Sequence, residues 1–210
     1  MNTAPFKEHV AEYEDWFEKN PLVFDTELNA IRKIWPAGEG LMSLEVGSGT
    51  GRFSSALNIR CGLEPCPNMD ARAMERGMET VRGRAEDMPF LDEQFDVVLI
   101  NSAISYFSNA NRALREAYRV LKSGGTLILG FIPKNSRLGV MKEKKKEERI
   151  FGKAATLYAV EEVVEKLESA GFHQLQFYQT LFKDPDDLKE NEPLLPGYGQ
   201  GSYVFIKAIK

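Results

Sequence analysis

The sequence LMSLEVGSGTGRF, residues 41–53, joins a short apolar run to a glycine-rich turn. The apolar run ends at Val46 and is typical of a buried strand, and a helix is predicted to begin at about Arg52. Between them, glycine occupies three alternate positions, Gly47, Gly49 and Gly51. Glycine permits positive φ angles and lets a ligand approach the backbone and the positive end of the following helix. The stretch therefore predicts a ligand-binding loop between a strand and a helix.

The spacing of these glycines distinguishes this loop from two known kinds of nucleotide-binding loop. The dinucleotide fingerprint G-x-G-x-x-G needs a glycine where this chain has Arg52. The phosphate-binding loop needs a lysine that the turn lacks. Glu45, two residues before the first glycine, suits a ligand with a cationic end better than a pyrophosphate. A tight turn without a ligand is the alternative, although each of the three glycines would cost about 1 kcal/mol relative to alanine.

The motif E-V-G-S-G-T-G resembles motif I of the class I S-adenosylmethionine (SAM) methyltransferases. The segment REAYRVLKSGGTLILG, residues 115–130, is similar to the stretch after the fourth strand in the UbiE-like, methyltransferase type 11 group, which acts on small molecules. The resemblance covers about residues 40–210. It implies a doubly wound, Rossmann-like α/β fold with a seven-stranded mixed sheet in the order 3-2-1-4-5-7-6, an antiparallel terminal hairpin and SAM as the cofactor.

Two further strands carry residues that fit this expectation. A short strand at 59–65 ends in Glu64, and a helical crossover should place it parallel to the first strand. An acid there can accept hydrogen bonds from both ribose hydroxyls, although an exposed strand-end carboxylate is the alternative. The run FDVVLINSAISYF, residues 95–107, is continuously apolar at first, and its end from Asn101 to Tyr106 should open beside the glycine loop. The segment N-S-A-I does not match the N-P-P-Y of methyltransferases that act on planar amides or adenine.

The resemblance implies a set of contacts with the cofactor and the acceptor. The position after Gly83, often an acid in the family, is Arg84 here, so adenine recognition is expected from the Ala85 backbone and Glu86, with a helix N-terminal acid as the alternative role for Glu86. The cofactor-binding residues are expected to be Glu45, Gly47, Ser48, Gly49, Thr50, Gly51, Glu64, Pro65, Ala85, Glu86, Asn101 and Tyr13. The acceptor side is expected to include Trp16, Tyr106 and Tyr158. No residue has a spacing that identifies it as a catalytic base.

Three segments organise the chain. Residues 1–36 are expected to form a helical cap with aromatic residues at helical spacing, which either pack on the domain or form a lid over the ligand. Residues 37–210 should form the methyltransferase domain, with a substrate-side insertion at 133–157. The insertion contains KEKKKEER, whose mixed charges indicate a solvated helix rather than a contact with nucleic acid. Residues 172–182 and 202–210 alternate like strands and should pair antiparallel, whereas a dinucleotide fold would end in a parallel strand.

Composition narrows the remaining possibilities. The chain has 210 residues and a net charge of −4, so no general field attracts nucleic acid. No apolar run reaches the length of about 18 residues that a membrane span needs. Two cysteines without a disulfide pattern predict a cytoplasmic location, and two separated histidines predict that there is no metal site. The oligomeric state is not predicted.

These observations favour methyl transfer from SAM to a small-molecule acceptor at an amine, hydroxyl or ring carbon. One alternative is a SAM- or nucleoside-binding protein without transferase activity. A nicotinamide-dependent oxidoreductase is a further alternative, disfavoured by Arg52 and by the terminal hairpin.

Overall fold

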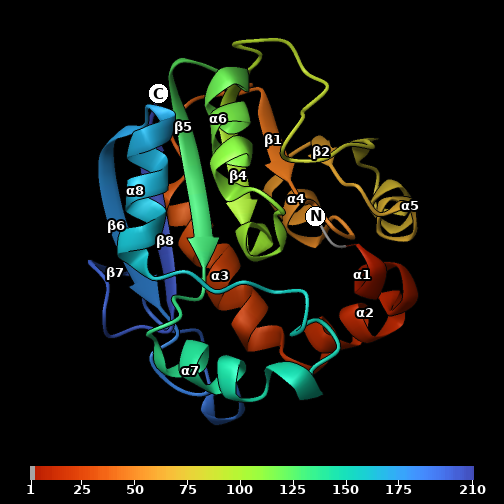
Figure 1. The fold of residues 1–210 in the computed structure, drawn as a ribbon, viewed down its shortest axis with the longest axis vertical. Helices are drawn as coiled ribbons and strands as arrows, with labels where there is room; N and C mark the ends of the chain where they lie inside the picture. Colours follow the sequence, from red (N-terminus) through yellow and green to blue (C-terminus); the bar gives the residue numbers. More distant parts are fainter. Residues whose placement is uncertain (1–2) are drawn as a thin grey trace.

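A mixed eight-stranded sheet forms the centre of the computed structural model, which describes residues 3–210 (Figure 1). The strand order is β3-β2-β1-β4-β5-β8-β6-β7. The strands are β1 (Ser43–Val46), β2 (Cys61–Leu63), β3 (Glu79–Val81), β4 (Phe95–Asn101), β5 (Leu121–Phe131), β6 (His173–Thr180), β7 (Leu195–Pro196) and β8 (Tyr203–Ile209). The first five strands are parallel, and β8 runs antiparallel to both β5 and β6.

The predicted strand order 3-2-1-4-5-7-6 is confirmed when the two-residue strand β7 is left out of the count, because β8 is then the seventh strand along the chain. The predicted number of strands was one too few. Leu195–Pro196, in the Pro- and Gly-rich segment between the two predicted terminal strands, forms the two-residue strand β7 and pairs with Tyr178 and Gln179 at the edge of the sheet. A strand of two residues ending in proline carries no period-two pattern that the sequence could reveal.

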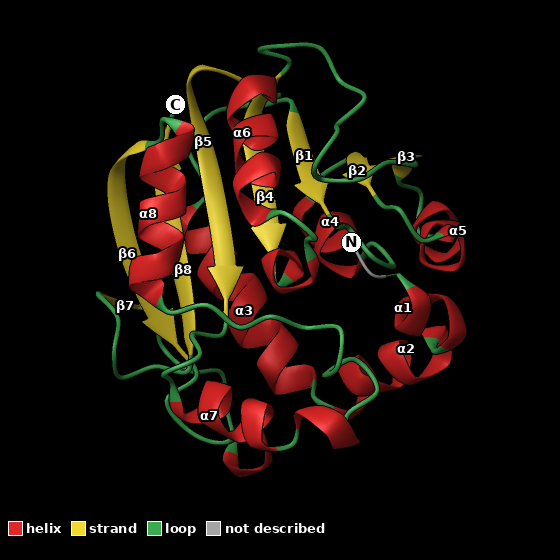
Figure 2. Cartoon of the chain, viewed as in Figure 1, coloured by secondary structure: helices red, strands yellow, loops and turns green. Residues whose placement is uncertain are grey.

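The central strand β4 explains why helices cover both faces of the sheet, as Figure 2 shows. Successive side chains of a strand point to opposite faces. Val98 and Ile100 pack into the core beneath α6 (Ala110–Val120) and α8 (Val160–Ala170). Leu99 packs into the second core with α3 (Pro21–Ile34) and α4 (Arg52–Leu57). A strand buried on both faces must be apolar at consecutive positions, as this one is.

Local signals place most helix ends correctly. Helix α4 begins at Arg52 as predicted, directly after Gly51, which has a positive φ of 77°. The Asn109 side chain caps α6 by accepting a hydrogen bond from the Arg112 backbone amide at 3.0 Å. The sequence NMDARAMERG, residues 68–77, predicts a helix capped by Asn68, but this prediction is wrong. Helix α5 (Pro67–Glu75) has Cys66 at its N-cap, and the Asn68 amide donates to the Lys7 carbonyl of the N-terminal segment.

Two helical segments lie near the carboxyl ends of the parallel strands (Figure 1). One comprises α1 (Ala4–Glu8) and α2 (Val10–Lys19), which are separated at His9. The other comprises α7 (Arg137–Lys144) and the 3-10 helix η2 (Lys146–Glu148). Two further 3-10 turns are η1 (Ala103–Tyr106) and η3 (Pro185–Asp187). Both segments therefore lie beside the end of the sheet where the parallel strands terminate.

Within residues 3–210, none of the helices has the length and apolar character needed to span a bilayer. The same residues contain no group of three or more histidine, cysteine, aspartate or glutamate side chains arranged to hold a metal ion.

Candidate cofactor and acceptor site

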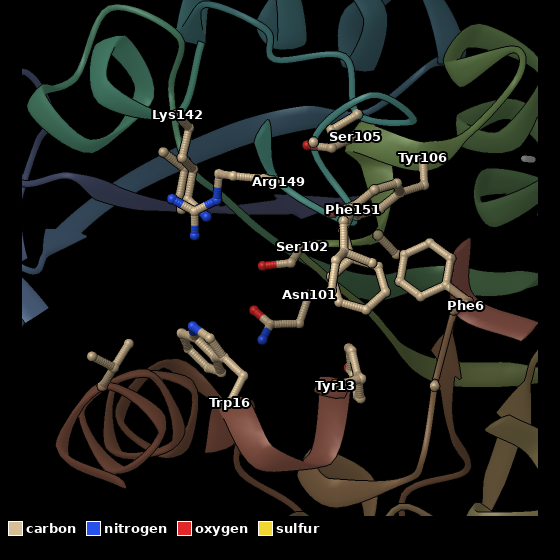
Figure 3. A pocket seen from close by; sticks show the side chains of 18 of the residues that line it. Phe6, Tyr13, Trp16, Asn101, Ser102, Ser105, Tyr106, Lys142, Arg149 and Phe151 are labelled. Carbon is tan, nitrogen blue, oxygen red and sulfur yellow. The ribbon is translucent and has the colours of Figure 1, made fainter. Parts of the chain in front are cut away.

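A cavity of about 660 Å³ lies at the carboxyl ends of the central strands. Its walls come from segments far apart in the sequence: the N-terminal helices, the glycine loop, the end of β4 and the segment 133–157 (Figure 3). Open α/β sheets bind ligands at this edge. The cavity is therefore the candidate site.

The glycine loop lines this cavity with its backbone. Gly47 and Gly49 line the wall, and both have positive φ angles, 74° and 56°. A Cβ atom on Gly49 would lie 3.1 Å from the hydroxyl oxygen of Tyr13, so a side chain would enter the ligand space. Gly51 is different, because a Cβ there would meet the Met78 sulfur at 2.4 Å. Its missing side chain therefore serves packing against α5 rather than the cavity wall.

Glu64 is held against the loop by two backbone amides. Its carboxylate accepts hydrogen bonds from Gly49 at 2.9 Å and from Cys66 at 2.8 Å. The side chain is buried yet lines the cavity. Burial raises the pKa of Glu64 to about 7, against the lowering effect of the two amides. Each oxygen keeps a lone pair that can accept a further hydrogen bond from a ligand hydroxyl.

Glu45 lies behind the first glycine and also lines the cavity. It is buried, and its carboxylate accepts a hydrogen bond from the Ser54 hydroxyl. Burial raises the pKa of Glu45 to about 8, and the nearby charge of Glu64 acts in the same direction. Among the described residues no cation forms an ion pair with either acid. A ligand with a positive charge would therefore relieve an existing electrostatic cost.

The end of β4 carries a polar network that sequence reasoning missed in part. Asn101 accepts a hydrogen bond from the Tyr203 hydroxyl at 2.8 Å and donates to Glu27 at 3.3 Å. Ser102 contacts the same Tyr203 hydroxyl at 2.8 Å. Burial raises the pKa of Glu27 to about 7. The signal for Glu27 was present in the sequence, since it lies four residues from the buried Val23 on the apolar face of α3.

Aromatic side chains form the rest of the wall beside the N-terminal helices. Tyr13, Trp16 and Tyr106, all predicted to contact a ligand, line the cavity (Figure 3). Burial raises the pKa of Tyr106 to about 12. Two rings were not predicted. Phe6 stacks on Phe151 with ring centroids 5.0 Å apart, so the N-terminal segment and the segment 133–157 meet across the cavity.

Six predicted site residues lie outside this wall. They are Thr50, Gly51, Pro65, Ala85, Glu86 and Tyr158. The Glu86 carboxylate accepts hydrogen bonds from the backbone amides of Ser108 at 2.6 Å and Asn109 at 3.3 Å, which fixes the turn before α6. The Tyr158 ring packs on the core beneath α8, with the Lys166 ammonium 5.5 Å from its centroid. A contact of Ala85 or Glu86 with adenine, and of Tyr158 with an acceptor, stays a prediction.

Arg52, the residue that breaks the dinucleotide fingerprint, has a structural role of its own. Its guanidinium donates to Glu14 at 2.6 Å and to Glu18 at 2.6 Å, both on α2. It also lies 4.9 Å from the centroid of the Phe17 ring. Arg76 on the loop after α5 donates to the same Glu14 carboxylate at 2.6 Å. Charge-assisted hydrogen bonds therefore attach the N-terminal helix to the helix that follows the glycine loop.

The residues present fit SAM. The glycine backbone leaves room for a ligand, and the carboxyl groups of Glu45 and Glu64, which have no cationic partner among the described residues, can face a ligand that carries positive charge and ribose hydroxyls. The antiparallel pairing of β8 with β5 departs from a dinucleotide fold, in which the last strand is parallel.

Comparison with known proteins agrees with this fit. Residues 44–129 match the family model described as a methyltransferase domain. A solved structure from Thermotoga maritima, described as a SAM-dependent methyltransferase and possible histamine N-methyltransferase, is 40% identical with a TM-score of 0.95 and 99% coverage of both chains. The chain belongs to the SAM-dependent methyltransferases. The fold, the enzyme class and the cofactor predicted from the sequence are thereby confirmed, and the nicotinamide alternative is excluded.

Two relatives extend the comparison to other organisms. An uncharacterized protein of Methanocaldococcus jannaschii is 38% identical over 205 residues, which is 98% of each chain. The uncharacterized methyltransferase YcgJ of Bacillus subtilis is 31% identical over 137 residues, which is 53% of each chain.

Proposed function

We propose that this methyltransferase acts on a small-molecule acceptor bound in the cavity beside the glycine loop. The observation that carries the proposal is the cavity itself, whose volume of about 660 Å³ lies within the range of about 300–1,000 Å³ typical of small-molecule sites. The same cavity touches the glycine loop and the aromatic wall formed by Tyr13, Trp16 and Tyr106.

The bound cofactor supplies an electrophilic methyl group on a sulfonium, and the chain supplies position and shelter. We assign Glu45 and the loop from Gly47 to Gly49 to the methionine end, and Glu64 to the ribose, because these groups line one wall. Holding the two reactants in line removes entropy from the barrier, an effect of about 7–11 kcal/mol at best. The aromatic rings exclude water from the reacting groups.

We assign residues 1–36 as a helical cap and residues 133–157 as a substrate-side insertion of the methyltransferase domain at 37–210. Support comes from the stacking of Phe6 on Phe151 and from the ion pairs between Arg52 and α2. These contacts close the cavity from two sides without adding to the sheet. The name of the Thermotoga maritima relative, which mentions histamine, also favours a small acceptor.

Incubation with methyl-tritiated SAM and a size-fractionated cell extract tests the proposal. We expect label to enter the fraction below about 1 kDa, with mass spectrometry then identifying the methylated product. The Gly49→Val variant is the control, since its loop should not accept the cofactor. Label found only in protein or nucleic acid would contradict a small-molecule acceptor.

A further inference from the structure

We propose that the acceptor carries an anionic group, a carboxylate or a phosphate, which Lys142 and Arg149 bind inside the cavity. The inference rests on the proposed small-molecule function and specifies the acceptor's chemistry. Both cations line the cavity and reach into it from the side opposite Tyr13 and Trp16 (Figure 3).

Neither cation has a partner of its own. Within residues 3–210, Lys142 and Arg149 form no ion pair or hydrogen bond with another side chain. Their neighbours behave differently. Lys146 pairs with Glu143 at 3.4 Å, and Lys153 pairs with Glu147 at 3.4 Å. Lys146 also lines the cavity but has an acid partner, and the unpaired Lys144 and Lys145 are exposed to solvent, so within residues 3–210 Lys142 and Arg149 are the half-buried cavity cations without an acid.

Two other basic residues, near the start of the segment 133–157, also have acid partners. Lys134 pairs with Glu162 at 2.9 Å, and Arg137 pairs with Asp184 at 2.6 Å. Paired surface ions of this kind contribute little to stability and need no ligand. Two half-buried cations without an acid have a desolvation cost that a bound anion would offset.

The surroundings of the Lys142 ammonium also favour the binding of an anion. Burial lowers the pKa of Lys142 to about 8, and the positive charge of Arg149 adds to the lowering. The opposing charge comes from Glu27, which is too far away for an ion pair and is hydrogen-bonded to Asn101. The positive charges of Lys142 and Arg149 therefore repel each other at the cavity wall. An anion placed between them would interact favourably with both.

Acids do line the cavity, but they leave this pair of cations unneutralised. Glu12 accepts a hydrogen bond from His9 at 2.8 Å, and Glu143 is engaged by Lys146. Glu148 is exposed at the rim. An acceptor with an ammonium at this wall would meet two unpaired positive charges, which disfavours cationic acceptors. The guanidinium of Arg149 presents a planar fork that matches the oxygens of carboxylate and phosphate.

The nearby rings indicate what joins the anionic group to the reacting atom. Phe151, two residues after Arg149, lines the cavity, and Trp16 lines its wall on the side opposite the two cations (Figure 3). An aromatic or apolar body would fill the space between Lys142 and the glycine loop. The acceptor class is therefore a small organic anion with an apolar or aromatic body.

Binding of matched aromatic probes to the enzyme saturated with S-adenosylhomocysteine tests this inference. Phenylacetate, 2-phenylethanol and 2-phenylethylamine share a ring and differ in charge, and phenyl phosphate distinguishes the two kinds of anion. Isothermal titration calorimetry should show at least one anionic probe binding about tenfold or more tightly than the alcohol and the amine. The comparison of phenylacetate with phenyl phosphate then states which oxyanion the wall prefers.

Variants assign the preference to the two residues. Lys142→Met and Arg149→Met should each reduce the preference for the anionic probe severalfold, and the double variant should abolish it. Lys145→Met is the matched control, because Lys145 follows α7, is exposed and does not line the cavity. Affinity for S-adenosylhomocysteine should stay unchanged in all four proteins, which shows that they remain folded.

The inference would be overturned by equal affinity for the charged and uncharged probes, by failure of both anions to bind, or by an anion preference that survives the double variant. Tighter binding of the alcohol or the amine would also overturn it while leaving small-molecule methyl transfer in place. Label found only in macromolecules of the extract would instead remove the proposed function itself.

Discussion

The glycine-loop wall and the insertion wall of the cavity are built in opposite ways. Glu45 and Glu64 are buried acids fixed by Ser54 and by backbone amides next to the central strands. Lys142 and Arg149 are half-buried cations on long side chains from a segment with exposed neighbours. In the proposed site, hydrogen bonds close to the strands therefore fix the cofactor wall, whereas long side chains form the acceptor wall. A fold arranged in this way can keep one cofactor while changing its acceptor.

The largest expected effect is the loss of cofactor affinity caused by a substitution in the glycine loop. Gly49→Val places a β-branched side chain at a φ of 56° and into the space beside Tyr13. Binding of S-adenosylhomocysteine measured by calorimetry should weaken by at least about 100-fold, roughly 2.7 kcal/mol. Gly77→Val is the matched control, because Gly77 has a φ of 81° and open space around it. Undiminished affinity in Gly49→Val would contradict the placement of the cofactor.

A subtler change separates charge from shape on the same wall. Glu64→Gln keeps the size of the side chain but leaves only one oxygen for the amides of Gly49 and Cys66 and for the ribose. Loss of a charge-assisted hydrogen bond costs about 1.5–3 kcal/mol, so affinity for S-adenosylhomocysteine should fall about 10- to 100-fold. Glu75→Gln, on the exposed side of α5, should leave the affinity unchanged. Equal losses in both variants would show that Glu64 has no special role.

The attachment of the N-terminal helix to the cofactor wall should matter less. Arg52→Ala removes the hydrogen bonds to Glu14 and Glu18, but Arg76 still holds Glu14. Amide hydrogen exchange over residues 10–19 should accelerate, and affinity for S-adenosylhomocysteine should weaken only by about threefold. Arg72→Ala, which removes an exposed pair with Glu75, is the control. Unchanged exchange in Arg52→Ala would show that other contacts hold α2.

The smallest expected effect is a pH dependence of folding stability that comes from the buried acids Glu45 and Glu64. The pKa of Glu45 is raised by burial from 4.5 to about 8, so the folded protein binds this proton more tightly than the unfolded chain. This contribution to stability is complete below pH 4.5 and is lost as the pH rises to about 8. Glu64, with a pKa raised to about 7, acts in the same direction.

The Tm of the ligand-free protein should therefore fall less between pH 5 and pH 8 in Glu45→Gln than in the wild type. Glutamine cannot ionise, and it can still accept the hydrogen bond from Ser54. Scanning fluorimetry at several pH values measures the difference. Identical pH profiles for the two proteins would show that Glu45 does not carry the effect.

The sequence predicted the parts of the molecule that local patterns determine. The alternate glycines, the continuous apolar run of β4 and the antiparallel end of the sheet each appear as predicted. The acids Glu45 and Glu64 both line the cavity. These features depend on spacing within one or two elements, which a single sequence displays. The cytoplasmic location and the absence of nucleic-acid partners stay predictions.

The features that the sequence did not reveal depend on contacts between distant segments. The stacking of Phe6 on Phe151 joins residues 145 positions apart, and neither ring stands out in its own segment. Lys142 and Arg149 lie in a run of mixed charges that predicted a solvated helix, and most of that run is exposed. Only the tertiary structure shows that Lys142, Lys146 and Arg149 line the cavity and that, of these three, Lys146 is the one paired with an acid.

A crystal structure with S-adenosylhomocysteine tests most directly whether the cofactor binds at the glycine-loop wall and leaves the opposite wall to the acceptor. The account predicts the ribose hydroxyls within hydrogen-bonding distance of Glu64 and the methionine end against Gly47 and Gly49. The space in front of Lys142 and Arg149 should remain free for the acceptor. Ligand density with the nucleoside against those two cations, or a glycine loop that contacts no ligand, would contradict it.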